Sequence, residues 1–182
     1  FLMDNYKKAI DELLIEIAKK IPQEHVKYPI KAYIVGGVAN YLYTQARVSD
    51  DIDMIISHRI DLPRNLFVVY LKDDSFEKLT FDDNYTDTLG LMHEDYVDRA
   101  KLYKIIDDKF EVYVLSPIDL VISKILRFSD NDEQDIKGLI QRKLVDKEKL
   151  IELATDAINV GVGFNPSTAK HNLDLVLEHF SE

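Results

Sequence analysis

Residues 35–56, VGGVANYLYTQARVSDDIDMII, decide the fold. They predict a strand that ends at Gly36-Gly37, a helix over 38–46 and a second strand over 51–56. Because residues two apart on a strand share a face, Asp51 and Asp53 place two carboxylates side by side. A divalent cation such as Mg²⁺ removes the repulsion between them. The Gly-Gly turn lets backbone N–H groups approach a phosphate. Each piece alone has an ordinary structural explanation, but their order and spacing together predict a metal and phosphate site.

The rest of the chain predicts a mixed sheet followed by helices. We expect an α/β (α+β) fold, in which residues 1–116 form the α/β core. We expect residues 117–182 to form a C-terminal helical segment that packs on the sheet and completes the site, so that the chain is one compact unit. The other expected strands are 30–35, 66–71 and a hairpin of 101–106 with 110–115, and the expected helices are 4–20, 117–128, 132–143, 147–159 and 167–180.

Composition excludes several classes of protein. The chain has 182 residues, no cysteine and a formal net charge of −10. Without cysteine there is no disulfide, thiolate zinc site or thiol nucleophile. No apolar run reaches the roughly 20 residues of a membrane span, so we expect a cytoplasmic protein without a membrane partner. The acidity argues against nonspecific nucleic-acid binding.

The acidic segment 73–98 is distinct, because it holds nine acidic residues and one lysine. A solvated surface excursion explains it most simply. A flap over a site or a docking surface for a basic partner are the alternatives.

The motif resembles the nucleotidyltransferase superfamily of DNA polymerase β. Gly36-Gly37 is followed by 13 residues and then by Asp51-Ile52-Asp53-Met54. It is more similar still to the small bacterial nucleotidyltransferases related to abortive-infection and toxin–antitoxin toxins, because residues 47–53 (RVSDDID) match their Rx[ST]xDID pattern. Downstream, residues 116–120 (SPIDL), Lys124 and the DxxDhxxL pattern of residues 132–139 continue the likeness, with Ile118 in place of the usual acid.

This resemblance implies metal and phosphate ligands. Asp51 and Asp53 would bind the metal, whereas Gly36, Gly37 and Ser49 would contact the triphosphate. The superfamily takes a third carboxylate from a later strand.

Glu111, in the strand FEVYV, is the candidate for that third metal ligand. The alternative is that Glu111 is a solvent-facing strand residue.

The resemblance also assigns the helical residues. Lys124, and with less support Arg127, would contact the nucleotide phosphates, although a lysine at the edge of an apolar stripe can also extend harmlessly to solvent. Asp135 would be a base for the acceptor hydroxyl, and Asp132 or Asp135 can alternatively stabilise a helix N-terminus. Arg47 would bind the triphosphate or pair with Asp50.

The implied activity is transfer of a nucleoside monophosphate from an NTP to an acceptor hydroxyl, with Mg²⁺ or Mn²⁺ as cofactor. The acceptor would be a tRNA, a protein or a small molecule, and a cognate antitoxin would be a partner. A non-enzymatic nucleotide-binding or interaction module is the alternative. A helical scaffold, whose functional part is residues 117–182, is a third class.

Overall fold

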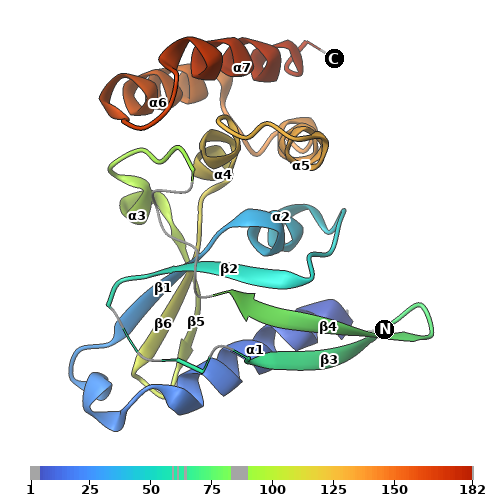
Figure 1. Ribbon diagram of the computed structural model, residues 1–182, viewed down its shortest axis with the longest axis vertical. Coiled ribbons are helices and arrows are strands. Elements are labelled where there is room, and N and C mark those ends of the chain that lie inside the picture. Colours follow the sequence, from blue (N-terminus) through green and yellow to red (C-terminus); the bar gives the residue numbers. More distant parts are fainter. Residues whose placement is uncertain (1–4, 59, 61, 64, 83–89, 182) are drawn as a thin grey trace.

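The computed structural model describes residues 5–58, 60, 62, 63, 65–82 and 90–181. Within these residues a mixed sheet is arranged in the order β3-β4-β2-β1-β6-β5 (Figure 1). The strands are β1 (Ile30–Ile34), β2 (Asp51–Ile56), β3 (Phe67–Lys72), β4 (Ser75–Asp82), β5 (Lys101–Ile106) and β6 (Phe110–Val114). The helices are α1 (Asn5–Lys20), the 3-10 helix η1 (Gln23–Val26), α2 (Gly36–Thr44), α3 (Tyr96–Arg99), α4 (Pro117–Lys124), α5 (Asp130–Gln141), α6 (Lys147–Val160) and α7 (Pro166–Glu178).

The register around β2 fixes where its carboxylates lie. β1 and β2 are antiparallel and are joined through α2, and Ile34 is opposite Met54. On its other side β2 runs parallel to β4, with Asp51 beside Thr80. The first residues of β2 therefore lie next to the Gly-Gly turn on one side and the last residues of β4 on the other.

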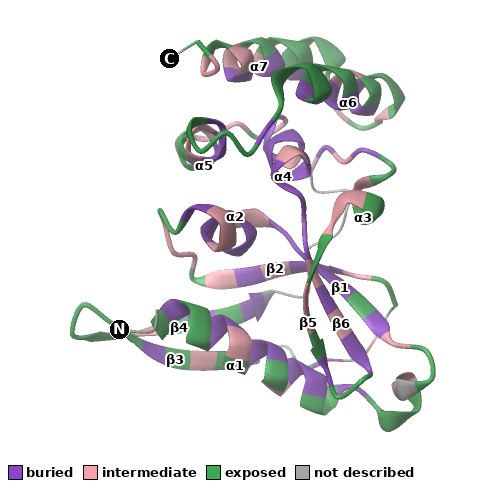
Figure 2. Ribbon diagram, turned by 180° about the vertical axis from the view of Figure 1, so that it is seen from behind, coloured by how far each residue is buried: buried purple, intermediate pink, exposed green. Residues whose placement is uncertain are grey.

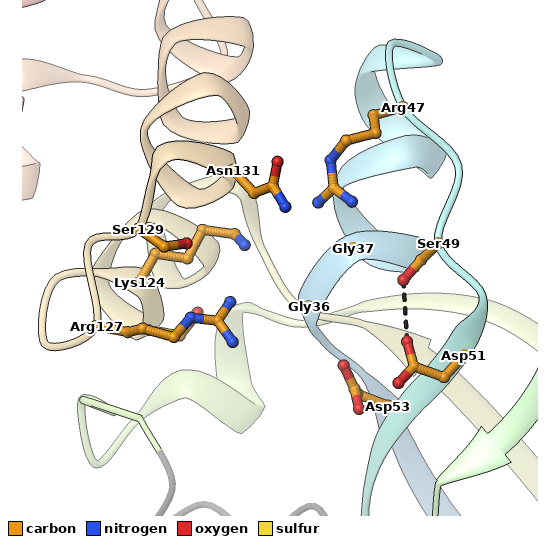
Figure 3. Close-up of a pocket in the computed structure, with 11 residues that line it drawn as sticks. Gly36, Gly37, Arg47, Ser49, Asp51, Asp53, Lys124, Arg127, Ser129 and Asn131 are labelled. Carbon is orange, nitrogen blue, oxygen red and sulfur yellow. Dashed lines mark hydrogen bonds between the residues drawn. The ribbon is translucent and has the colours of Figure 1, made fainter.

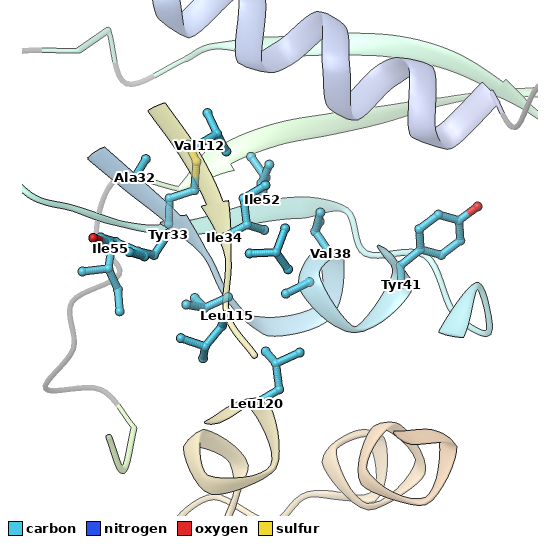
Figure 4. Close-up of a cluster of buried hydrophobic side chains, with 14 of the residues drawn as sticks. Ala32, Tyr33, Ile34, Val38, Tyr41, Ile52, Ile55, Val112, Leu115 and Leu120 are labelled. Atoms are coloured by element: carbon cyan, nitrogen blue, oxygen red, sulfur yellow. The ribbon is translucent and has the colours of Figure 1, made fainter. Parts of the chain in front are cut away.

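The two faces of the sheet differ in burial. Ile52 of β2 is fully buried, while its neighbours Asp51 and Asp53 on the opposite face are partly exposed. The buried face packs against α1 and α2, whose rings of Tyr6 and Tyr41 meet edge to face with centroids 4.6 Å apart. Figure 4 shows this core between the strands and α2, and Figure 2 shows buried residues along β1, β6 and α4. Asp51 and Asp53 therefore lie on the less buried face of β2, where a ligand can reach them.

The C-terminal helices begin with strong local signals. Pro117 is in the first turn of α4, and the Ser116 side chain caps that helix by accepting a hydrogen bond from Asp119 N at 3.3 Å. α4 packs against α2 and α5, and α6 and α7 form the outermost layer (Figure 1). The predicted mixed sheet and the helices after residue 116 are confirmed.

Two expectations need correction. α2 begins at Gly36, two residues before the predicted start, so the glycines belong to its first turn. The acidic segment is not wholly a surface excursion, since residues 75–82 form β4 inside the sheet. The apolar side chains of Leu79 and Phe81 alternate with polar ones and are buried, which the many acids obscure in the sequence. Residues 83–89 of that segment lie outside the described part.

In the part of the chain that the structure describes, no helix is both long and apolar enough to cross a membrane.

Candidate active site

A pocket of about 720 Å³ lies where the start of β2 faces α4 and α5. Figure 3 shows two walls, one from α2 and β2 with the carboxylates and the other from the α4–α5 region with basic and polar side chains. The lining residues are Gly36, Gly37, Arg47, Ser49, Asp51, Asp53, Ser123, Lys124, Arg127, Ser129 and Asn131. Eight of the residues singled out in the sequence as metal or nucleotide ligands therefore meet in one place.

The carboxylate wall depends on the absence of a side chain at Gly36. Gly36 has φ +64°, a conformation that L side chains rarely adopt, and a Cβ there would lie 2.5 Å from Asp53 Oδ2. Asp53 also anchors the turn, because its backbone oxygen accepts a hydrogen bond from Val35 N at 3.0 Å. Glycine is thus required here by both backbone conformation and space, and it lets the carboxylate lie against the turn.

The second glycine makes room for Ser49. A Cβ at Gly37 would lie 2.9 Å from Ser49 Oγ, and that hydroxyl donates to Asp51 Oδ1 at 3.0 Å. At the start of α2 the N-cap is Val35, which supplies no side-chain hydrogen bond. The first N–H groups of the helix are therefore not capped by that residue, and the positive end of the helix dipole is at the pocket.

Tyr6 of α1 holds the loop before β2. Its hydroxyl donates to Ser49 O at 2.8 Å and accepts from Ser49 N at 2.9 Å. Burial is the main reason why the pKa of Tyr6 is raised well above its usual range, so the phenol stays protonated and can donate. Two hydrogen bonds from α1, which is not part of the motif, therefore fix the backbone of Ser49.

The basic wall is built on two buried carboxylates. Lys124 Nζ lies 3.0 Å from Asp132 Oδ1 and 3.0 Å from Asp135 Oδ2. Arg127 Nε donates to Asp132 at 2.6 Å, and Arg47 Nη2 donates to Asp135 at 2.9 Å. The side chain of Lys124 is 4% exposed and enclosed by the protein, whereas that of Arg127 is 74% exposed although two hydrogen bonds hold it to Asp132.

Asp132 both starts α5 and holds the cations. Ser129 and Asp132 form a reciprocal capping box, in which Asp132 N donates to Ser129 Oγ at 3.3 Å and Ser129 N donates to Asp132 Oδ2 at 3.1 Å. Burial would raise the pKa of Asp132, but hydrogen bonds from Arg127 and Ser129 and the charge of Lys124 together hold it well below its usual range. The helix-terminus role expected for Asp132 is present, with cation binding in addition.

Asp135 has the contacts of a positioning residue. Its Oδ1 accepts from Asn40 Nδ2 at 2.9 Å, and its Oδ2 faces both Arg47 and Lys124. Both oxygens are thus already engaged by donors, which does not favour the predicted role as a base. The alternative expectation for Arg47 was an ion pair with Asp50, but its carboxylate partner in the structure is Asp135, at 2.9 Å.

Glu111 does not reach the pocket. It is beside Lys31 in the register of β6 and β1, and the backbone oxygen of Lys31 accepts from Ser57 N, beyond the far end of β2. Asp53 is four residues from Ser57, about 13 Å along the strand direction. The hydroxyl of Tyr113 donates to Glu111 Oε2 at 2.8 Å. The later strand does join the same sheet, but its register puts Glu111 at the wrong end.

The register instead brings the backbone of another acidic residue to the site. Asp82, the last residue of β4, is directly beside Asp53 in the parallel pairing of β4 and β2. Sequence reasoning missed it because β4 lay inside the acidic segment. Among the residues that the structure describes with side chains, no third histidine, cysteine or acid joins Asp51 and Asp53 in a metal-binding cluster.

Several pocket residues had no motif to indicate them. Ser123, Ser129 and Asn131 line the pocket from α4 and α5, and Asn40 supports Asp135 from α2. The sequence offered two weaker indications. Asn40 is an amide among the mostly apolar residues of the predicted helix 38–46, and Ser129 begins a Ser-x-x-Asp capping pattern.

Comparison with known proteins places the chain in a family. No curated protein matches it. A crystal structure of an antigenic nucleotidyltransferase-like protein from Paracoccidioides brasiliensis is similar at 16% identity, over 93% of this chain and 89% of that chain, with a TM-score of 0.36. The model of a family described as nucleotidyltransferase of unknown function (DUF6036) matches residues 12–182. The chain belongs to this nucleotidyltransferase family of unknown function.

Proposed function

We propose that the protein is a divalent-metal-dependent nucleotidyltransferase, which moves a nucleoside monophosphate from an NTP to an acceptor hydroxyl. The observation that carries this proposal is the separation of charge in one pocket, with Asp51 and Asp53 on one wall and Lys124 and Arg127 on the other. A metal–triphosphate complex has the complementary arrangement, since the cation needs oxygen ligands and the phosphates need positive charge.

The carboxylate pair fits a hard cation. Asp51 and Asp53 are partly exposed, lie on one face of a rigid strand, and Gly36 leaves the space in front of Asp53 that a Cβ would fill. Mg²⁺ or Mn²⁺ bound there would neutralise phosphate charge in the transition state.

The other residues bind and orient the triphosphate. The uncapped first turn of α2 and the Ser49 hydroxyl offer donors to its oxygens. Lys124 presents a charge fixed by Asp132 and Asp135, and the exposed Arg127 offers the phosphates a second positive charge, held in place by Asp132. The acceptor oxygen attacks the α-phosphorus, the bond to pyrophosphate breaks, and the proton of the hydroxyl passes to solvent.

The test uses NTPs labelled at the α-phosphate, Mg²⁺ and mixed acceptors (tRNA, protein and aminoglycosides). Asp53→Asn should abolish label transfer, because it removes one metal ligand and keeps the shape of the side chain. Asp107→Asn is the matched control, since Asp107 is in the β5–β6 turn with φ 52° and asparagine tolerates that conformation. Transfer that survives Asp53→Asn would refute the site. Nucleotide binding without transfer by the wild type would favour the non-enzymatic module, and no binding at all would exclude both.

The finer assignment is a toxin with a cognate antitoxin, which rests on the RVSDDID likeness of residues 47–53. Induced expression of the wild type should then arrest bacterial growth and Asp53→Asn should not. Equal growth of the two strains would contradict it.

A further inference from the structure

A second hollow lies beside the carboxylates, on the open face of the β3–β4 hairpin. It has a volume of about 290 Å³ and is lined by Asn65, Leu66, Phe67, Lys78 and Thr80. Thr80 is next to Asp51 in the register of β4 and β2, and its hydroxyl donates to Asp50 O at 3.2 Å. The hollow therefore adjoins the proposed transfer site along one continuous sheet face.

Beyond the hollow, this face is apolar and exposed. Phe67, Val69 and Leu71 alternate along β3 and are 47%, 48% and 44% exposed, and Phe76 of β4, which is opposite Leu71, is 80% exposed. The reverse face of the hairpin already packs against α1 through residues such as Tyr70. A sheet face turned to water normally carries polar side chains, so a large apolar one indicates a partner.

We infer that this face, here named the hairpin face (Phe67, Val69, Leu71, Phe76, Lys78 and Thr80), binds an extended segment of an acceptor polypeptide, whose serine, threonine or tyrosine hydroxyl receives the nucleotide. The inference rests on the proposed function and names the substrate class of the same site. From Thr80 to Phe76 the face runs about 13 Å along the strands, the length of about four extended residues.

The strand position and the charge favour a polypeptide over RNA. β3 is an edge strand of the described sheet, and an added peptide strand can pair with such an edge. Residues 67–82 of the hairpin hold four acids and two lysines, a net charge of −2, which disfavours a phosphodiester backbone and favours a basic segment.

A cation–π contact between Lys78 and Phe67 lies at the hollow. Lys78 Nζ lies 4.5 Å from the centroid of the Phe67 ring, so the ammonium group rests over the aromatic face. A polypeptide backbone carbonyl can accept from that ammonium group while an apolar side chain covers Phe67. The transfer itself forms the bond between the acceptor oxygen and the α-phosphorus and releases pyrophosphate and a proton.

The test is label transfer from α-labelled NTPs with Mg²⁺ to a library of 13-residue peptides with a central Ser, Thr or Tyr, beside an arm with total tRNA. The variant is Val69→Lys with Leu71→Lys. Both side chains are exposed, and lysine is common on edge strands, so we expect the variant to fold. Its matched control is Leu102→Lys with Ile105→Lys on β5, the other edge strand, where the two side chains are 54% and 51% exposed. We expect labelled peptides, a loss of at least tenfold with the β3 variant, and no loss with the β5 variant.

Two outcomes would overturn the acceptor assignment: label on tRNA and on no peptide, or transfer to peptides by the β3 variant at the wild-type level. A wild-type dimer in light scattering that the β3 variant dissociates would also overturn it, since the face would then bind a second copy. Failure of the proposed function is distinguishable, because Asp53→Asn would then transfer label like the wild type, or the wild type would not bind NTP.

Discussion

Replacing Gly36 by alanine tests whether the turn exists to position Asp53. Gly36 has φ +64°, and its Cβ would lie 2.5 Å from Asp53 Oδ2. Gly163 is a matched control, because its φ is +84° and a Cβ there meets nothing within 4 Å. Both substitutions therefore strain the backbone in the left-handed region, but only Gly36→Ala also displaces a carboxylate.

The two variants should differ in activity more than in stability. Left-handed alanine costs about 1 kcal/mol, so Gly163→Ala should lower the urea midpoint by about 0.5 M if the slope is about 2 kcal/mol per M. In Gly36→Ala the Asp53 oxygen must in addition retreat by about 1 Å to reach ordinary van der Waals separation. A displacement of that size at a reacting centre can reduce the rate about 100-fold.

The assays are urea unfolding followed by tyrosine fluorescence, and label transfer from an α-labelled NTP at saturating Mg²⁺. Gly163→Ala should transfer label at the wild-type rate. If Gly36→Ala also does so, Asp53 is not held by the turn and the assigned geometry is wrong. If both variants lose activity equally, strain rather than the carboxylate contact is responsible.

Three further predictions concern the supports of the pocket. Lys124→Ala should lower the free energy of unfolding by about 3–5 kcal/mol in urea titrations, because it leaves Asp132 and Asp135 buried with fewer cations; an unchanged midpoint would contradict a fixed ion pair. The pKa of Asp132 is lowered in the folded state, so its contribution to stability is present above about pH 4 and is lost as the pH falls through the folded pKa. The difference in unfolding free energy between the wild type and Asp132→Asn should therefore shrink in acid. A difference that stays constant down to pH 2 would refute the idea that the ionised Asp132 stabilises the fold through its cations. Tyr6→Phe removes both hydrogen bonds to Ser49 and should cost about 1–3 kcal/mol and raise KM for the NTP, whereas an unaltered KM would show that Ser49 needs no such support.

The sequence was most informative where local chemistry and structure coincide. The alternation of Asp51, Ile52 and Asp53 placed the carboxylates on one face, and Ser116-Pro117 marked the start of α4. These signals depend on neighbouring residues in the chain, so they can be read without knowing the fold.

What the sequence could not show depends on register and on long-range pairing. Glu111 and Asp82 are both acids on later strands, and only the pairing of β4 with β2 decides that Asp82 is next to Asp53. Likewise, the partner of Arg47 is Asp135, 88 positions further along the chain. Such contacts follow from how strands and helices assemble, which periodicity does not specify.

The proposed function requires an acidic protein to bind an anionic nucleotide, and the charges of the pocket offer a reason why it would. The pocket is lined by the cations Arg47, Lys124 and Arg127 and the carboxylates Asp51 and Asp53, and the buried carboxylates Asp132 and Asp135 pair with its cations. Together these groups have a formal charge of −1, which a divalent metal changes to +1. The wild type should therefore bind NTP poorly in EDTA. The double variant Asp51→Asn with Asp53→Asn changes the walls to a formal +1 without metal, so in EDTA it should bind NTP more tightly than the wild type does. Equal affinity of the two proteins in EDTA, measured by calorimetry, would mean that the carboxylates do not set the potential that the phosphates meet.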